Sequence, residues 1–91
     1  MNVGLVAIHY PHDAHRNELI DVFKRAAEAM RQTPGCLGTE IWVNVADGTI
    51  VTTGRWASDE ALDASFAAAG VSIAQDERES RPRDILKLVA L

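Results

Sequence analysis

The sequence predicts an α+β fold in which strands and helices follow the order β-α-β-β-α-β. Apolar residues recur at three- and four-residue steps over 14–33 and 58–69, the spacing of helices packed on one side. Asp47-Gly48 separates two runs rich in Val, Ile, Thr and Trp, which is a strong hairpin signal. Apolar runs near both ends of the chain supply the outer strands. This order is that of a ferredoxin-like fold, an antiparallel sheet with both helices on one face.

The first strand is expected over Val3–Tyr10, and Pro11 ends it because proline has no backbone N–H. Asp13 is a suitable N-cap for a helix from about Ala14 to Thr33. Pro34 follows and prevents the helix from continuing. The apolar stripe of this helix consists of Leu19, Val22, Phe23, Ala26, Ala27 and Met30.

The hairpin is expected to pair Leu37–Asn44 with Thr49–Trp56. If its turn contains only the two residues of the Asp-Gly pair, Glu40 faces Arg55. That pair shares its face with Trp42, away from the helices, where Trp42 suits a contact between subunits. The opposite face of the hairpin carries Thr39, Ile41, Val43, Thr52, Gly54 and Trp56.

The second helix is expected from Ser58, its N-cap, to about Ala69, with Gly70 as a left-handed residue after its end. Residues 70–82 are more polar and predict a short helix or a loop, a candidate lid. Arginines and acidic residues alternate near its end, which favours a solvated charged segment over an anion-binding site. The arginines are Arg78, Arg81 and Arg83. Ile85–Leu91 is the predicted last strand.

Length and charge limit the classes of protein. The 91 residues predict one domain over 1–91, which buries only about 60–65% of its unfolded surface and gains stability from a partner chain. A net charge of −4 disfavours nucleic acid and anionic membranes as partners. No long apolar run or leader pattern is present, so we expect a cytoplasmic protein. The single Cys36 is interpreted as a small buried residue.

The outer strands are apolar on both sides, yet the helices of one chain cover only one face of the sheet. The other face is therefore expected to pack on a second copy of the chain. A twofold dimer with the two sheets face to face is the simplest arrangement.

His9, His12 and His15 are the only histidines, and they lie within seven residues. Three imidazoles could hold a metal ion, but a strand end, a proline turn and a helix start separate them, so no metal site is expected. His9 shares a strand face with Val3, which makes it a candidate general base. A hydrogen-bonded structural histidine is the competing interpretation.

Trp56 is the strongest single candidate for a functional residue. It lies where the hairpin meets the second helix, so its indole could form the wall of an apolar pocket and its N–H could donate to a substrate oxygen. The alternative is a core residue that fixes the turn from strand to helix.

The chain resembles the antibiotic biosynthesis monooxygenase superfamily of dimeric α/β barrels. The resemblance is carried by Thr33-Pro34-Gly35-Cys36-Leu37-Gly38, by the hairpin and by Arg55-Trp56-Ala57-Ser58-Asp59-Glu60-Ala61-Leu62. In the quinone-forming oxygenases of this superfamily the tryptophan that matches Trp56 lines the pocket. Their asparagine and tyrosine fall on Thr52 and Leu62 here. The histidine of the haem-degrading members falls near Gln75, and this chain has no histidine after His15.

The resemblance implies a cofactor-independent monooxygenase, without bound metal, that acts on an aromatic or polyketide-like phenolic compound. Trp56 and His9 would be catalytic, and the substrate would contact Thr52, Leu62, Phe66 and Ile41. Two alternatives remain open, a non-catalytic dimer that binds a small apolar molecule and an isomerase or cyclase on the same scaffold.

Overall fold

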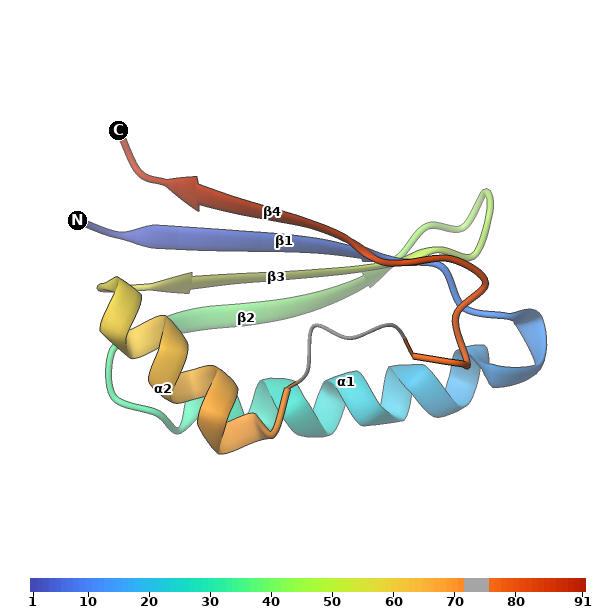
Figure 1. Ribbon diagram of the computed structural model, residues 1–91, viewed down its shortest axis with the longest axis horizontal. Helices are drawn as coiled ribbons and strands as arrows, with labels where there is room; N and C mark the ends of the chain where they lie inside the picture. Colours follow the sequence, from blue (N-terminus) through green and yellow to red (C-terminus); the bar gives the residue numbers. More distant parts are fainter. Residues whose placement is uncertain (72–75) are drawn as a thin grey trace.

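The computed structural model describes residues 1–71 and 76–91 and shows the expected order of strands and helices (Figure 1). A single 3-10 turn, Asp13–His15, precedes the first helix. The elements are β1 (Val3–His9), α1 (Arg16–Arg31), β2 (Cys36–Val43), β3 (Ile50–Trp56), α2 (Asp59–Ala69) and β4 (Asp84–Val89).

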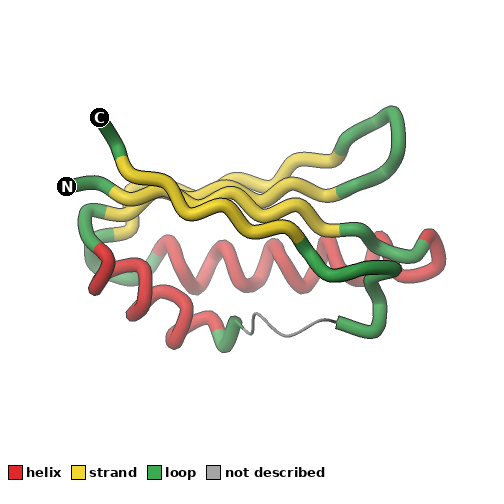
Figure 2. The backbone as a smooth tube through the Cα atoms, turned by 45° about the horizontal axis from the view of Figure 1, so that its top comes forward, coloured by secondary structure: helices red, strands yellow, loops and turns green. Residues whose placement is uncertain are grey.

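The four strands form one antiparallel sheet in the order β2-β3-β1-β4. Both helices lie against the same face of this sheet, and its other face is left open (Figures 1 and 2). The ferredoxin-like α+β prediction is therefore confirmed. The 3-10 turn delays α1 by two residues relative to the prediction, and Asp13 pairs with Arg16 at 2.5 Å instead of capping the helix.

The predicted register of the hairpin is wrong by two residues. Glu40 pairs with Thr53 and not with Arg55, which faces Gly38. The turn is longer than the Asp-Gly pair, because the Asn44 N–H donates to the Thr49 carbonyl at 2.8 Å and closes a loop over 45–48. A shift of two residues leaves every side chain on its predicted face of the sheet.

Helix α2 begins and ends as the sequence predicts. The Ser58 hydroxyl accepts a hydrogen bond from the Ala61 N–H at 3.1 Å. Gly70 ends the helix in the left-handed region with a φ of 66°. The helix thereby holds Leu62 against Val3 and Trp56, and these three buried side chains form the core cluster.

The polar segment before β4 contacts the end of β1. Residues 72–75 of the predicted lid lie outside the described residues. Beyond them, the His12 N–H donates to the Arg78 carbonyl at 2.9 Å and the Ser80 N–H donates to the Tyr10 carbonyl at 2.7 Å. Glu79 also forms an isolated bridge with Pro11. These contacts bring a charged stretch of the C-terminal part of the chain to one end of the space between sheet and helices.

Candidate functional site

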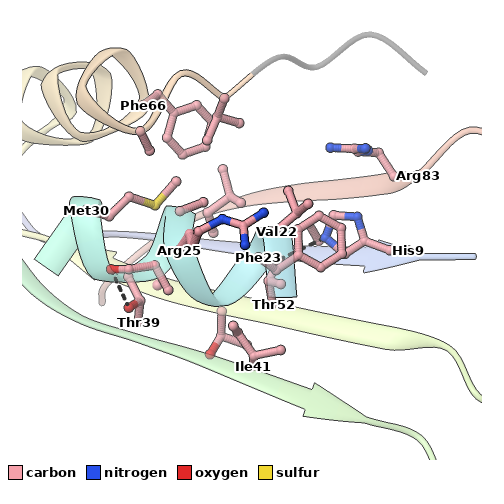
Figure 3. Close-up of a pocket in the computed structure, with 18 of the residues that line it drawn as sticks. His9, Val22, Phe23, Arg25, Met30, Thr39, Ile41, Thr52, Phe66 and Arg83 are labelled. Atoms are coloured by element: carbon pink, nitrogen blue, oxygen red, sulfur yellow. Dashed lines mark hydrogen bonds between the residues drawn. The ribbon is translucent and has the colours of Figure 1, made fainter. Parts of the chain in front are cut away.

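A cavity of about 530 Å³ lies between the sheet and the two helices. Its wall is mostly apolar. His9 and Arg83 lie at one end of it, and Arg25 and Thr39 add polar groups elsewhere along it (Figure 3). Every strand, both helices and the segment before β4 contribute lining side chains. The lining residues include His9, Phe23, Arg25, Ile41, Thr52, Trp56, Phe66 and Arg83.

Trp56 forms part of the cavity wall and is only 2% exposed. Its indole lies over Gly54, where an added Cβ would collide with the ring. The ring of Phe66 approaches it edge-on, with centroids 6.2 Å apart. The indole N–H donates to the Ser65 hydroxyl at 2.8 Å, so in this structure the donor that we predicted for a substrate oxygen is occupied by Ser65.

His9 lies at the end of β1 and is 3% exposed. Its Nε2 is 3.1 Å from the Thr52 hydroxyl, and its ring packs on Phe23 with centroids 4.2 Å apart. Burial lowers the pKa of His9 from 6.5 to about 4, against the opposing effect of the nearby Glu79 carboxylate. The imidazole is therefore neutral at physiological pH, and one of its ring nitrogens carries a free lone pair.

Glu79 and Arg83 also belong to this site, although the sequence pattern favoured a solvated charged segment over an anion-binding site for this stretch. The Glu79 carboxylate is almost wholly buried, with Oε1 3.6 Å from His9 Nδ1. It accepts hydrogen bonds from the Tyr10 N–H at 3.1 Å and from the Arg83 guanidinium at 2.5 Å. The prediction of a solvated charged segment is wrong for these two residues, because backbone contacts with Tyr10, Pro11 and His12 bring the segment into the space between the sheet and the helices.

A second set of ion pairs ties the same segment to α1. Arg78 donates to Asp76 at 2.7 Å and to Glu18 of α1 at 2.9 Å. The Arg78 hydrogen bonds lower the pKa of Asp76 to about 2. These partly exposed pairs neutralise the carboxylates beside the cavity, and they link the segment to the helix that forms one cavity wall.

The structure places the other predicted residues in different surroundings. Thr52, Phe66 and Ile41 line the cavity, whereas Leu62 lies in the core cluster and not among the lining residues. Trp42 is 57% exposed on the open face. The described residues contain no group of three potential metal ligands, and the His15 ring pairs with Glu18 at 3.1 Å.

Comparison with known proteins identifies the family. The model of the antibiotic biosynthesis monooxygenase family matches residues 3–77, so the chain belongs to this family. No curated protein sequence matches the chain significantly.

Solved structures agree on the fold. Rv0793 from Mycobacterium tuberculosis is 22% identical over 100% of this chain and 96% of its own, with a TM-score of 0.81. A structure of an antibiotic biosynthesis monooxygenase is 17% identical over 98% of both chains, with a TM-score of 0.79. A variant of SnoaB, a cofactor-independent oxygenase from Streptomyces nogalater, is 20% identical over 98% of this chain and 92% of its own, with a TM-score of 0.76.

Proposed function

We propose that this protein is a cofactor-independent monooxygenase that acts on an aromatic or polyketide-like phenolic compound. The observation that carries the proposal is a neutral imidazole, His9, in the wall of an otherwise mostly apolar cavity. Family membership and the similarity to SnoaB, a cofactor-independent oxygenase, support the reaction class. The cavity of about 530 Å³ is large enough for a polycyclic ligand.

The chemistry needs a base and a dry space. His9 takes a proton from the substrate, and the resulting phenolate or carbanion gives one electron to O2. The substrate radical and superoxide recombine to a peroxide, which loses water. The net change is a CH2 group and O2 converted to a carbonyl group and water, so the substrate itself is the reductant. Excluding water strengthens the electrostatic interactions that stabilise the anion.

The lining residues divide this work. Trp56 and Phe66 form an aromatic wall against which a planar substrate stacks, and Ile41 fills the side formed by β2. The Thr52 hydroxyl lies beside His9 Nε2 and interacts with the proton that is transferred. Leu62 acts indirectly, because it packs against Trp56 and fixes the indole.

The guanidinium of Arg25 suits the anionic form of the substrate. Arg25 lines the cavity from α1 (Figure 3), and the described residues provide no hydrogen bond or ion pair for it. Arg78 and Arg83, which also line the cavity, already bind carboxylates. A phenolate or carboxylate of the substrate would therefore meet Arg25 at the side of the cavity formed by α1.

The active form is proposed to be a homodimer through the open face of the sheet. On this face β1, β3 and β4 present apolar side chains beside the exposed indole of Trp42. The apolar members are Val6, Ile8, Val51, Leu86 and Leu88. Burying them against a second copy would remove the apolar surface that one chain leaves in water.

Oxygen consumption tests the activity. The purified, metal-stripped protein is mixed with anthrones, naphthols and other oxidisable phenols, and Trp56→Phe is compared with wild type. We expect protein-dependent uptake that falls about tenfold or more in the variant, which corresponds to about 1.4 kcal/mol of transition-state stabilisation. Val45→Ala, in the exposed loop of the hairpin and outside both the cavity and the open sheet face, is the control and should retain full uptake.

The two alternatives give different results in the same assay. A binding dimer would show ligand affinity that depends on Trp56 but no conversion of any compound. An isomerase or cyclase would convert its substrate equally fast with and without O2. Absence of uptake across the panel by a folded wild-type protein would contradict the oxygenase proposal.

A further inference from the structure

We propose that Glu79 is the positioning residue of this site. Its carboxylate holds the His9 imidazole in the tautomer that carries the proton on Nδ1, so that Nε2 is the nitrogen that accepts a proton from the substrate. Nε2 acts as a base only if the proposed function is correct, whereas the tautomer is a property of the protein alone. Glu79 and Arg83 lie beyond residue 77, where the match to the family model ends.

The first support is the burial of the pair. The side chains of His9 and Glu79 are 4% and 1% exposed. A carboxylate buried to this degree costs several kcal/mol unless charges and hydrogen bonds compensate it. The Arg83 guanidinium and the Tyr10 N–H supply that compensation, one to each carboxylate oxygen. Glu79 is thus fixed in place, with Oε1 directed to the end of β1.

The second support is the chemistry of the two facing atoms. Nδ1 of His9 is 3.6 Å from Glu79 Oε1, and it has no hydrogen-bond partner among the described residues. A carboxylate only accepts hydrogen bonds, so a lone pair on Nδ1 would face another lone pair in a buried site. An N–H at Nδ1 is attracted instead, and this attraction is strong where water is excluded. The separation exceeds a normal hydrogen bond and leaves room to tighten when the ring becomes charged.

The third support comes from the other ring nitrogen. Nε2 lies 3.1 Å from the Thr52 hydroxyl, which rotates freely and can donate its proton to an unprotonated Nε2. Both His9 and Thr52 line the cavity, whereas Glu79 is not among its lining residues. The basic nitrogen, Nε2, therefore faces Thr52, and the Glu79 carboxylate lies at the opposite ring nitrogen, Nδ1.

The proton transfer balances without a further reactant. The substrate O–H or C–H bond breaks, an N–H bond forms at Nε2, and the electron pair stays on the substrate. The imidazolium that results carries protons on both nitrogens, and the Glu79 carboxylate stabilises its charge through Nδ1–H. The proton on Nε2 is later returned when the peroxide loses water.

Nitrogen-15 NMR tests the tautomer without any substrate. Long-range proton–nitrogen correlations distinguish a protonated ring nitrogen from an unprotonated one, and the chain has only three histidines to assign. At pH 7 we expect His9 of the wild type to show a protonated Nδ1 and an unprotonated Nε2. A protonated Nε2, or rapid averaging of the two tautomers, would overturn the proposal even if every variant failed to fold.

Glu79→Gln removes the charge and keeps the size of the side chain. We expect it to lose the single Nδ1–H tautomer, whereas Glu77→Gln, the same change at an exposed position two residues away, should leave the His9 signals unchanged. A folded E79Q protein that kept the Nδ1–H tautomer would also overturn the proposal.

If oxygen uptake is observed, E79Q should lower kcat about tenfold or more with less than a twofold change in KM. Absence of uptake in wild type counts against the proposed function and leaves the NMR result standing.

Discussion

His9 shows how burial decides the chemistry of a residue. A strand-end histidine in water would be partly charged near neutral pH, but this one packs on Phe23 and is 3% exposed. The sequence placed it on the correct face of the first strand. The sequence could not indicate that Glu79 is buried beside His9, because this contact depends on how the C-terminal segment folds back across a separation of about 70 residues.

The lowered pKa of His9 predicts a specific loss of stability in acid. The unfolded chain binds a proton to this histidine below about pH 6.5, whereas the folded protein binds it only near pH 4. The unfolded state therefore holds more protons between these values, and the free energy of unfolding should fall as pH drops from 6.5 to 4. Urea denaturation at several pH values measures this change in the free energy of unfolding.

His9→Gln is the control for this pH dependence. It should flatten the curve between pH 6.5 and 4, whatever its own stability at pH 7. Asp76 has a pKa of about 2 in the folded protein, so its contribution is lost only in more acidic solution. If the free energy of unfolding of His9→Gln falls between pH 6.5 and 4 as steeply as that of wild type, groups other than His9 cause the loss of stability.

Strand β3 can place the Trp56 indole in the cavity wall because the neighbouring residue on the same face, Gly54, has no side chain. Gly54 has no side chain, and the ring of Trp56 occupies the space that a Cβ would need. The hairpin pattern predicted this strand and the faces of its side chains. Its register was missed by two residues, because the hydrogen bond between Asn44 and Thr49 closes a longer turn than the Asp-Gly pair alone suggests.

Gly54→Ala should displace the indole from the cavity wall. The added methyl group overpacks the site, and we expect a loss of about 1–3 kcal/mol in the free energy of unfolding. Gly4→Ala in β1 is the matched control, because its Cβ would meet its nearest neighbours at 3.6 and 3.7 Å, which is ordinary contact. Equal stability losses in the two variants would contradict this account of Gly54.

The whole molecule has one covered and one open sheet face. The apolar pattern of the outer strands predicted this asymmetry, since the helices of one chain cover a single face. In the structure all of β4 is exposed, and Leu86 and Leu88 lie on the open face, 51% and 49% exposed. The described helices include none that is long and apolar enough to cross a membrane.

Leu88→Arg should separate the proposed dimer. A charge placed in the middle of an apolar contact loses solvation that no partner restores, so association should weaken strongly. Sedimentation velocity should give a dimer for wild type and a monomer for L88R. Lys24→Glu on the exposed side of α1 is the control and should remain dimeric. A monomeric wild type would contradict the dimer proposal and leave the cavity unaffected.

The central claim is that His9 and its cavity transfer an atom of O2 to a phenolic substrate. The most direct measurement is the mass of the product formed under 18O2, with wild type and His9→Gln compared at equal concentration. We predict that wild type forms a quinone with one added 18O atom faster than the uncatalysed reaction, and that the variant loses this acceleration. Product formed at the uncatalysed rate, or product without 18O, would contradict the claim.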